Sequence, residues 1–327
     1  MGPLRLVLPF CLALMAQAQH PILIDTDAGT DDLMAIAFLA SQPAVHIEAV
    51  TVVNGLAHPE AGAKNIVRLL GLAGRTDTPV FAGRNTPLNG KAEFPAEWRK
   101  ISDDLPGVSL PAPSRKPESK PAAGYLVERL RDQTRPVRIL ALGPLTNLAE
   151  ALKREPSIAS MIEELVIMGG ALHVPGNLGD GGVFKTNNTT AEWNIFVDPL
   201  AARIVFRSGV PIRLIPLDAT NKVRVDSAFL SKFKTGARSP LARIVAQVLE
   251  SDRAFIEGGF FYAWDPLAAV ALLHPDVVKT TKLHIDILQD APSEGRTVQA
   301  PGRPDVRVAL DADGAAWRKW FLEALER

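Results

Sequence analysis

The feature that most constrains the fold of this chain is a regular alternation of short β-branched runs with longer runs of helical periodicity. It begins with 22–25 then 31–41 and 46–53 then 59–72, and continues at 79–82, 137–142, 145–153, 164–168, 199–208, 212–217, 241–255 and 266–273. Strands separated by helices pair in parallel, because the helix carries the chain back across the sheet. We therefore expect an α/β fold with a Rossmann-like, mostly parallel (mixed) central sheet flanked by helices.

One stretch interrupts this pattern. Residues 102–121 are rich in proline, serine and charge, as expected of a long surface loop. Strand-like runs of the same type lie on both sides, so one domain with an insertion is a simpler account than two domains. A chain of 327 residues with 47% hydrophobic residues can bury one large core of this kind.

The first 18 residues have the pattern of an export signal. Arg5 precedes an apolar run from 6 to 15, and the small-x-small triplet 16–18 follows. We expect cleavage there and a single domain over 20–327, exported to a periplasm or secreted. The run is too short for a membrane span, and the alternative is a buried first strand or helix. Cys11, the only cysteine, falls in this segment, so thiol catalysis and a cysteine metal site are not expected.

The overall charge argues against one class of partner. The chain has 36 Lys plus Arg and 36 Asp plus Glu, with no basic tract. A nucleic-acid backbone is held by a positive field, which this composition does not supply. We do not expect a nucleic-acid polymer as a partner.

A cluster of aspartates follows the first predicted strand. Residues 24–32 read Ile-Asp-Thr-Asp-Ala-Gly-Thr-Asp-Asp, which places four carboxylates within eight residues at a strand-to-helix turn. Like charges this close raise one another's pKa unless a cation neutralises them, and oxygen donors suit Ca²⁺ or Mg²⁺. In a parallel sheet, ligands bind beyond the carboxyl ends of the strands, where this turn is expected.

Two other interpretations of the cluster are open from the residues alone. Asp31 and Asp32 could cap the following helix while Asp25 and Asp27 are solvated at the strand end. Alternatively, Asp25-Thr26-Asp27 could be an aspartyl-phosphate motif, in which one Asp attacks a phosphoryl group. The Gly-x-Asp-Asp continuation and the lack of a convincing downstream lysine and acidic pair disfavour the second interpretation.

The stretch 21–40, PILIDTDAGTDDLMAIAFLA, resembles the N-terminal signature of the nucleoside hydrolase family, the inosine-uridine preferring and related enzymes. Further fragments resemble the family in the same order along nearly the whole mature chain: 50–55, LGPLTN at 142–147, VIMGG at 166–170, AEWN at 191–194 with Asp198-Pro199, and WDP at 264–266. Each fragment is weak alone, but the ordered set is highly specific.

The resemblance implies a calcium site and a reaction. Asp27, Asp32 and Asp265 would ligate Ca²⁺ through carboxylates, with the backbone carbonyl of Leu142 as a further ligand. Asp27 would also take the proton from the attacking water as the base departs from ribose. The expected reaction is hydrolysis of a ribonucleoside to ribose and free base.

The resemblance also implies contacts to the sugar. Asp31, Glu192 and Asn194 would bind the ribose hydroxyls, which favours an oxocarbenium-like transition state. Asn177 is our choice for a further ribose contact, and Asn187 and Asn188 compete with it because this chain has a longer Gly-rich insertion than shorter family members. Without the resemblance, an exposed turn before a helix would be the simpler interpretation of Glu192 and Asn194.

The chain departs from the family pattern where many members place a histidine that can protonate the leaving base. Here the residue is Trp264, which cannot usefully donate a proton. It can stack on a base, and in this it resembles purine-preferring members, which hold the base between aromatic rings. The alternative is that Trp264 only packs in the core. Trp98 or Phe94 could supply a second aromatic face. His173 is the remaining candidate acid, although a lone loop histidine is usually just solvated.

A second departure is Leu56, where the family often has asparagine; Asn54 lies two residues earlier. We expect purine nucleosides to be favoured, with pyrimidine nucleosides or another N-riboside as the first alternative. A non-catalytic exported nucleoside- or ribose-binding protein is the second alternative. The family commonly forms dimers and tetramers, so the resemblance implies a homo-oligomer.

Overall fold

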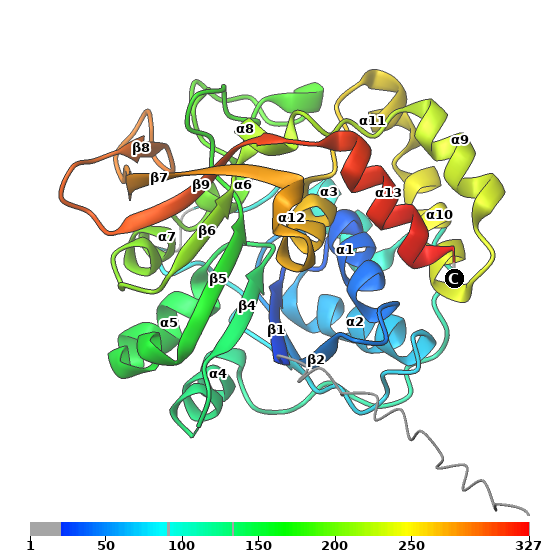
Figure 1. Cartoon of the computed structure of the whole chain (residues 1–327), viewed down its shortest axis with the longest axis horizontal. Coiled ribbons are helices and arrows are strands. Elements are labelled where there is room, and N and C mark those ends of the chain that lie inside the picture. The colour runs from blue at the N-terminus through cyan, green and yellow to red at the C-terminus, as the bar shows by residue number, and fades with distance from the viewer. Residues whose placement is uncertain (1–20, 90–91, 133, 327) are drawn as a thin grey trace, which may run out of the picture.

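The computed structural model describes residues 21–89, 92–132 and 134–326. The expected signal segment 1–18 therefore lies outside the described residues. The described chain forms one sheet of nine strands (Figure 1). In spatial order the strands are β3 (Val80–Ala82), β2 (His46–Val52), β1 (Pro21–Thr26), β4 (Val137–Ala141), β5 (Ile162–Met168), β6 (Ile212–Ile215), β9 (Asp305–Ala312), β7 (Val278–Ile287) and β8 (Thr297–Gln299).

The pairing of the strands is mostly parallel. Every pairing from β3 through β9 is parallel, whereas β7 is antiparallel to both β9 and β8. This confirms the predicted α/β class with a mixed central sheet. The antiparallel edge strands were not predicted, because the run 278–287 is mostly exposed and polar and carries no continuous apolar signal.

Helices cover both faces of the sheet (Figure 1). One face is covered by α1 (Thr30–Ala40), α2 (Pro59–Leu72) and α12 (Trp264–Leu273), and α10 (Pro240–Ser251) and α13 (Gly314–Leu325) pack against α1 behind them. The other packs against α4 (Ala122–Arg131), α5 (Thr146–Arg154) and α7 (Pro199–Phe206). The remaining helices are α3 (Ala96–Asp104), α6 (Trp193–Val197), α8 (Leu217–Thr220), α9 (Ser227–Gly236) and α11 (Arg253–Gly258), with 3-10 turns at η1 (Pro156–Met161), η2 (Asp180–Gly182) and η3 (Pro275–Val277).

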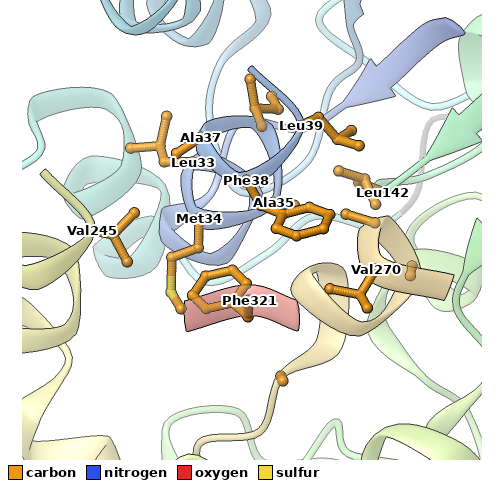
Figure 2. Packing of buried hydrophobic residues seen from close by; sticks show 14 of the residues in the cluster. Leu33, Met34, Ala35, Ala37, Phe38, Leu39, Leu142, Val245, Val270 and Phe321 are labelled. Carbon is orange, nitrogen blue, oxygen red and sulfur yellow. The ribbon is translucent and has the colours of Figure 1, made fainter. Parts of the chain in front are cut away.

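Side chains that alternate along β1 divide the interior into two cores. Ile22 and Ile24 face the α1 side, whereas Leu23 faces the α5 side, as strand geometry requires. Helix α1 is enclosed on all sides, and every side chain from 33 to 39 is fully buried (Figure 2). Phe38 of this helix stacks on Phe321 of α13 with ring centroids 5.9 Å apart. The helix that carries two of the aspartates is thus fixed in place by the core.

The strand order reverses beside β1. From β1 the chain passes through α1 to β2 on one side, and β4 later pairs on the other side. The connections leaving the two neighbouring strands diverge at such a point, which opens a crevice at their carboxyl ends. Asp27 follows β1 and Leu142 follows β4, so both predicted ligands lie at this crevice.

Two predicted segments differ from the structure. Residues 102–121 are not simply a surface loop, because α3 extends to Asp104 and the side chains of Leu105, Val108 and Leu110 are buried in the core. The unit at 241–255 is divided by Asp252, where α10 ends and α11 begins. Within the described ranges, no helix combines the length and apolarity needed to cross a membrane.

Candidate active site

A cavity of about 360 Å³ opens at the carboxyl ends of β1, β4 and β5. All of the residues predicted for the site line it: Asp27, Asp31, Asp32, Leu142, Asn177, Glu192, Asn194, Trp264 and Asp265. These residues are distant in sequence, and the sheet topology brings them together. The ordered family fragments therefore converge on one place in the fold.

Carboxylates form one end of the cavity, which we call the aspartate floor (Asp27, Asp31, Asp32 and Asp265). All four are at most 9% exposed. Asp31 and Asp32 lie in the first turn of α1 and Asp265 in the first turn of α12, and these two helices pack against each other. Carboxylate oxygens of Asp31, Asp32 and Asp265 lie within 4.8 Å of one another.

The Asp27 carboxylate is held by backbone that approaches it closely. Its Oδ2 accepts a hydrogen bond from the Leu56 N–H at 2.8 Å. A Cβ atom at Gly55 would lie 2.1 Å from that Oδ2, and one at Gly143 would lie 2.8 Å from the Asp27 Cβ. Two glycines from different strand ends thus leave only enough room for this side chain. Leu56, a departure from the family, contributes through its main chain, which any residue but proline supplies.

The interpretation of Asp31 and Asp32 as helix caps is correct in part, since Asp32 does cap α1. Asp32 Oδ2 accepts a hydrogen bond from the Gly29 N–H at 2.9 Å, and its Oδ1 accepts one from the Thr26 hydroxyl. These bonds orient the carboxylate at the start of α1, where the helix dipole favours negative charge. Each oxygen still has a lone pair for a ligand, so capping and metal binding are compatible.

Asp25 is separated from the rest of the cluster. Its Oδ1 accepts hydrogen bonds from the Thr51 hydroxyl at 2.6 Å and from Asn147 Nδ2 at 2.8 Å, and it does not line the cavity. The side chain is 1% exposed, so Asp25 is neither a solvated strand end nor an available nucleophile. The aspartyl-phosphate interpretation fails for this reason.

The four carboxylates of the floor need positive charge nearby if they are all to be ionised. Burial first, and then mutual repulsion, raise the pKa of Asp27, Asp31 and Asp265, and burial raises that of Asp32. No Lys, Arg or His from the described part of the chain lines the cavity. A hard divalent ion would replace the missing positive charge, and the donors present, carboxylates and a carbonyl, are those it prefers. The residues therefore fit a bound Ca²⁺.

Leu142 lines the cavity, and its backbone carbonyl has capacity for a ligand. It accepts a hydrogen bond from Asn194 Nδ2 at 3.0 Å, and the same Nδ2 lies 3.2 Å from the Met168 carbonyl oxygen. A carbonyl oxygen has two lone pairs, so one stays available. Asn194 therefore connects the ends of β4 and β5 as well as lining the cavity.

Glu192 is fixed by main-chain donors. It is the N-cap of α6, and its carboxylate accepts hydrogen bonds from the N–H groups of Gly170, Asn194 and Ile195 at 2.8, 2.9 and 3.2 Å. Burial raises the pKa of Glu192 to about 6, and these bonds oppose the rise. The exposed-turn interpretation is wrong, since Glu192 and Asn194 are 2% and 6% exposed.

Asn177 is the asparagine of the insertion that reaches the cavity. Its Oδ1 accepts a hydrogen bond from the Trp193 N–H at 3.2 Å. Asn188 instead stabilises a turn by bonding the N–H groups of Thr190 and Ala191 and the Glu294 carbonyl, and neither it nor Asn187 lines the cavity.

Aromatic side chains line another part of the cavity, which we call the aromatic wall: Phe94, Trp98, Trp193, Phe255, Phe260, Phe261 and Trp264. Trp264 is partly buried and lies 5.4 Å from Phe261 between ring centroids. Phe94 stacks on Trp193 at 4.8 Å, and Trp98 makes edge contacts to Trp193 and Phe255. Trp193, Phe255, Phe260 and Phe261 were not predicted for the site, because a scattered aromatic in a loop or short helix has no distinguishing pattern.

Two candidates from the sequence lie elsewhere. His173 does not line the cavity; its side chain is 52% exposed and its Nδ1 is 3.6 Å from Asp218 Oδ1. Asn54 does not compensate for Leu56, since its Oδ1 accepts a hydrogen bond from Arg99 Nη2 at 2.8 Å away from the cavity.

Comparison with known proteins supplies independent findings. The family model described as inosine-uridine preferring nucleoside hydrolase matches residues 22–319. The chain is 33% identical over 316 residues to the pyrimidine-specific ribonucleoside hydrolase RihA of Salmonella agona, covering 93% of this chain and 96% of that one. Among solved structures it is similar to a plant nucleoside hydrolase, PpNRh1, with a TM-score of 0.82, 29% identity and coverage of 94% and 99%. It is also similar to a purine-preferring ribonucleoside hydrolase from Gardnerella vaginalis, with a TM-score of 0.79, 26% identity and coverage of 94% and 98%.

Proposed function

The chain belongs to the inosine-uridine preferring nucleoside hydrolase family, enzymes that hydrolyse N-glycosyl bonds, and we propose that its own reaction is calcium-dependent and favours purine ribonucleosides. The products are ribose and the free base. The observation that carries the proposal is a buried floor of four carboxylates in a cavity that also has an aromatic wall and that no Lys, Arg or His of the described residues lines.

The residues of the floor divide the work. Asp27, Asp32, Asp265 and the Leu142 carbonyl would hold Ca²⁺, and the ion would supply positive charge that orients the sugar and acidifies water. Asp27, whose carboxylate is fixed between Gly55 and Gly143, accepts the proton of the attacking water. Asp31, Asn177, Glu192 and Asn194 bind the ribose hydroxyls.

The aromatic wall supports the preference for purines. Trp264 lies next to the metal ligand Asp265, so its ring is close to where the base attached to a bound ribose must lie. Larger bases gain more from stacking on such surfaces. Phe94 is already stacked on Trp193, so Trp98 and Phe255 are the better candidates for the second face.

Pyrimidine nucleosides are the second candidate substrates. The RihA relatives, which their name describes as pyrimidine-specific, share 33% identity with this chain over nearly its full length. The geometry of Asp27 argues against a purely binding role, because nucleoside binding alone does not require a carboxylate fixed by the Leu56 N–H and by two glycines.

Export and assembly complete the proposal. The leader-like residues 1–18 support release from the cytoplasm after cleavage, to a periplasm or to the medium. We also propose a homo-oligomer, a dimer or tetramer, on the basis of the family resemblance.

The first test is release of base and reducing sugar from inosine, guanosine, adenosine, uridine and cytidine, with calcium and with a chelator. We expect turnover that is faster on purines, that the chelator abolishes and calcium restores, and that Asp27→Ala lacks. Faster turnover of uridine and cytidine would favour the pyrimidine alternative. Binding without turnover of any of the five would contradict the hydrolase proposal and favour a binding protein.

A further inference from the structure

The leaving base presents a chemical requirement that the residues assigned so far do not meet. When the bond from ribose carbon to base nitrogen breaks, the electron pair stays on the base, and an acid that protonates the base lowers the barrier. Asp27 accepts a proton and cannot serve as that acid in the same step. No His, Lys, Arg, Tyr or Cys of the described chain lines the cavity, so the acid must come from the remaining carboxyl groups.

Asp252 is a carboxyl group that lines the cavity and does not cap the helix that it precedes. It occupies the N-cap position of α11, but its side chain makes no capping hydrogen bond. Asp198, Asp226 and Asp313 hold the same position on α7, α9 and α13, and each caps its helix with a carboxylate oxygen. The Asp252 side chain instead faces the cavity.

The surroundings of Asp252 favour a protonated carboxyl group. Its Oδ2 is buried and has no hydrogen-bond partner, as expected of an O–H group that is kept for a ligand. Burial raises the pKa of Asp252 to about 7, and a hydrogen bond with the Thr30 side chain partly opposes this rise. Asp31 of α1 lies close enough for the charge of Asp252 to raise the pKa of Asp31, so the two carboxyl groups are neighbours in the cavity. The adjacent Arg253 forms ion pairs with Glu250 and Glu257 and does not line the cavity.

Asp252 lies where the glycosidic bond of a bound nucleoside is expected. On one side it adjoins Thr30 and Asp31, which belong to or border the aspartate floor. On the other side the chain continues into Ala254 and Phe255, which line the aromatic part of the cavity. A nucleoside with its ribose on the floor and its base against the wall has its glycosidic bond at this boundary.

The other carboxyl groups of the cavity are less suited to donate a proton. Glu192 is held by three N–H donors, which stabilise its ionised form. Asp180 lies in a turn between the exposed residues Gly179 and Val183, where nearby water stabilises the ionised carboxylate, which has no proton to donate. The four floor aspartates are committed to the cation and the sugar.

We propose that Asp252 is the general acid that protonates the departing base. The bond from the ribose carbon to the base nitrogen breaks, its electron pair moves onto the base, and the Asp252 proton bonds to the base. Water forms the new bond to the ribose carbon and gives its proton to Asp27. Solvent then returns a proton to Asp252 as Asp27 releases one, so each turnover consumes one water molecule. The proposal rests on the hydrolase function above.

The test compares two leaving groups in the full-length mature enzyme with calcium. We would measure kcat/KM of Asp252→Asn and Asp252→Ala on inosine and uridine and on p-nitrophenyl β-D-ribofuranoside, whose phenolate leaves without protonation. Glu257→Gln, an exposed acid one turn along α11, is the matched control. We expect a loss of about 10²–10⁴-fold on nucleosides in both variants, with p-nitrophenyl riboside changed less than about tenfold.

Three readouts separate this role from a structural one. Melting temperature and calcium affinity should match the wild type, and the fall in nucleoside turnover above neutral pH should disappear in Asp252→Asn. Equal losses on both substrate types, or nucleoside turnover unchanged, would overturn the assignment of Asp252. If the wild type hydrolyses neither type, the proposed function itself fails, and that result is distinct from either of the others.

Discussion

The aspartate floor and the aromatic wall share one cavity but are built in different ways. Floor residues lie at the carboxyl ends of strands or in the first turns of buried helices, and the backbone fixes them, as Gly55 and Leu56 fix Asp27. Wall residues come mainly from the short helices α3, α6 and α11 and their flanking loops. Several of these, with Phe94 and Trp193 at the centre, form a third cluster apart from the two main cores.

This difference suggests a division of function. The floor is rigid because two large cores support the elements that carry it, so it can hold charges in a fixed arrangement. The wall is divided between the third cluster, which holds Phe94, Trp98 and Trp193, and the edge of the α1 core, and its Phe260 is 44% exposed. Substitutions in the floor should therefore abolish turnover of every nucleoside, whereas those in the wall should change the ranking of the bases.

The largest effect is expected from Gly55→Ala. The added Cβ would lie 2.1 Å from Asp27 Oδ2, so the carboxylate must move. A displacement of about 1 Å at a reacting group costs about 10²-fold, and we expect kcat to fall by at least that factor on all substrates. Gly124→Ala in α4, where the nearest atom is 3.8 Å away, is the control and should keep full activity. A variant that retains turnover would show that the floor is less rigid than this comparison requires.

The wall is tested by Trp264→Leu. Loss of a stacking surface costs about 0.5–1.5 kcal/mol more for a purine than for a smaller base, which is up to about tenfold in the purine-to-pyrimidine ratio of kcat/KM. Calcium affinity should not change. Trp320→Leu removes a tryptophan that stacks on His274 outside the cavity, and it should leave the ratio as it is. Equal losses on both classes of base would mean that Trp264 supports the floor instead.

The floor also predicts a pH-dependent effect of calcium on stability. The pKa values of its aspartates are raised above the ordinary value near 3.9, so the metal-free fold loses stability as pH rises through them. Calcium at about 100-fold its Kd should raise the melting temperature by about 5 °C at pH 8 and far less near pH 4.5, where the ligands are protonated. Thermal scans with calcium and with a chelator measure the difference. The same calcium effect at both pH values would argue against this coupling.

The smallest effect is expected from Leu56→Asn, which restores the residue that the family often has. Leu56 holds Asp27 through its N–H, which asparagine keeps, so transition-state stabilisation should change by about 1 kcal/mol or less. Steady-state rates on inosine and uridine measure it. A gain of more than about tenfold would show that the leucine side chain limits this enzyme.

Several parts of the fold and site could be predicted from the sequence because their signals are local. The strand and helix of the first unit follow from the periodicity of 22–41, and Asp27, Asp31 and Asp32 follow from one short motif. Asp265, Glu192 and Asn194 depended on resemblance to a family, since nothing in their own neighbourhoods indicates a ligand. Residues 102–121 were misjudged because three apolar side chains in a polar stretch do not show whether they reach a core.

The sequence by itself determined the class of the fold and the edge of the sheet at which the cavity lies, because parallel strands bring their carboxyl ends together wherever the pattern β-α-β repeats. Only the tertiary structure decided that Asp25 points away from the cluster while Asp252 points into the cavity. Both residues occur in ordinary contexts, a strand and the junction of two helices. The direction of their side chains depends on packing partners far away in the sequence, Asn147 for Asp25 and α1 for Asp252, which no local pattern encodes.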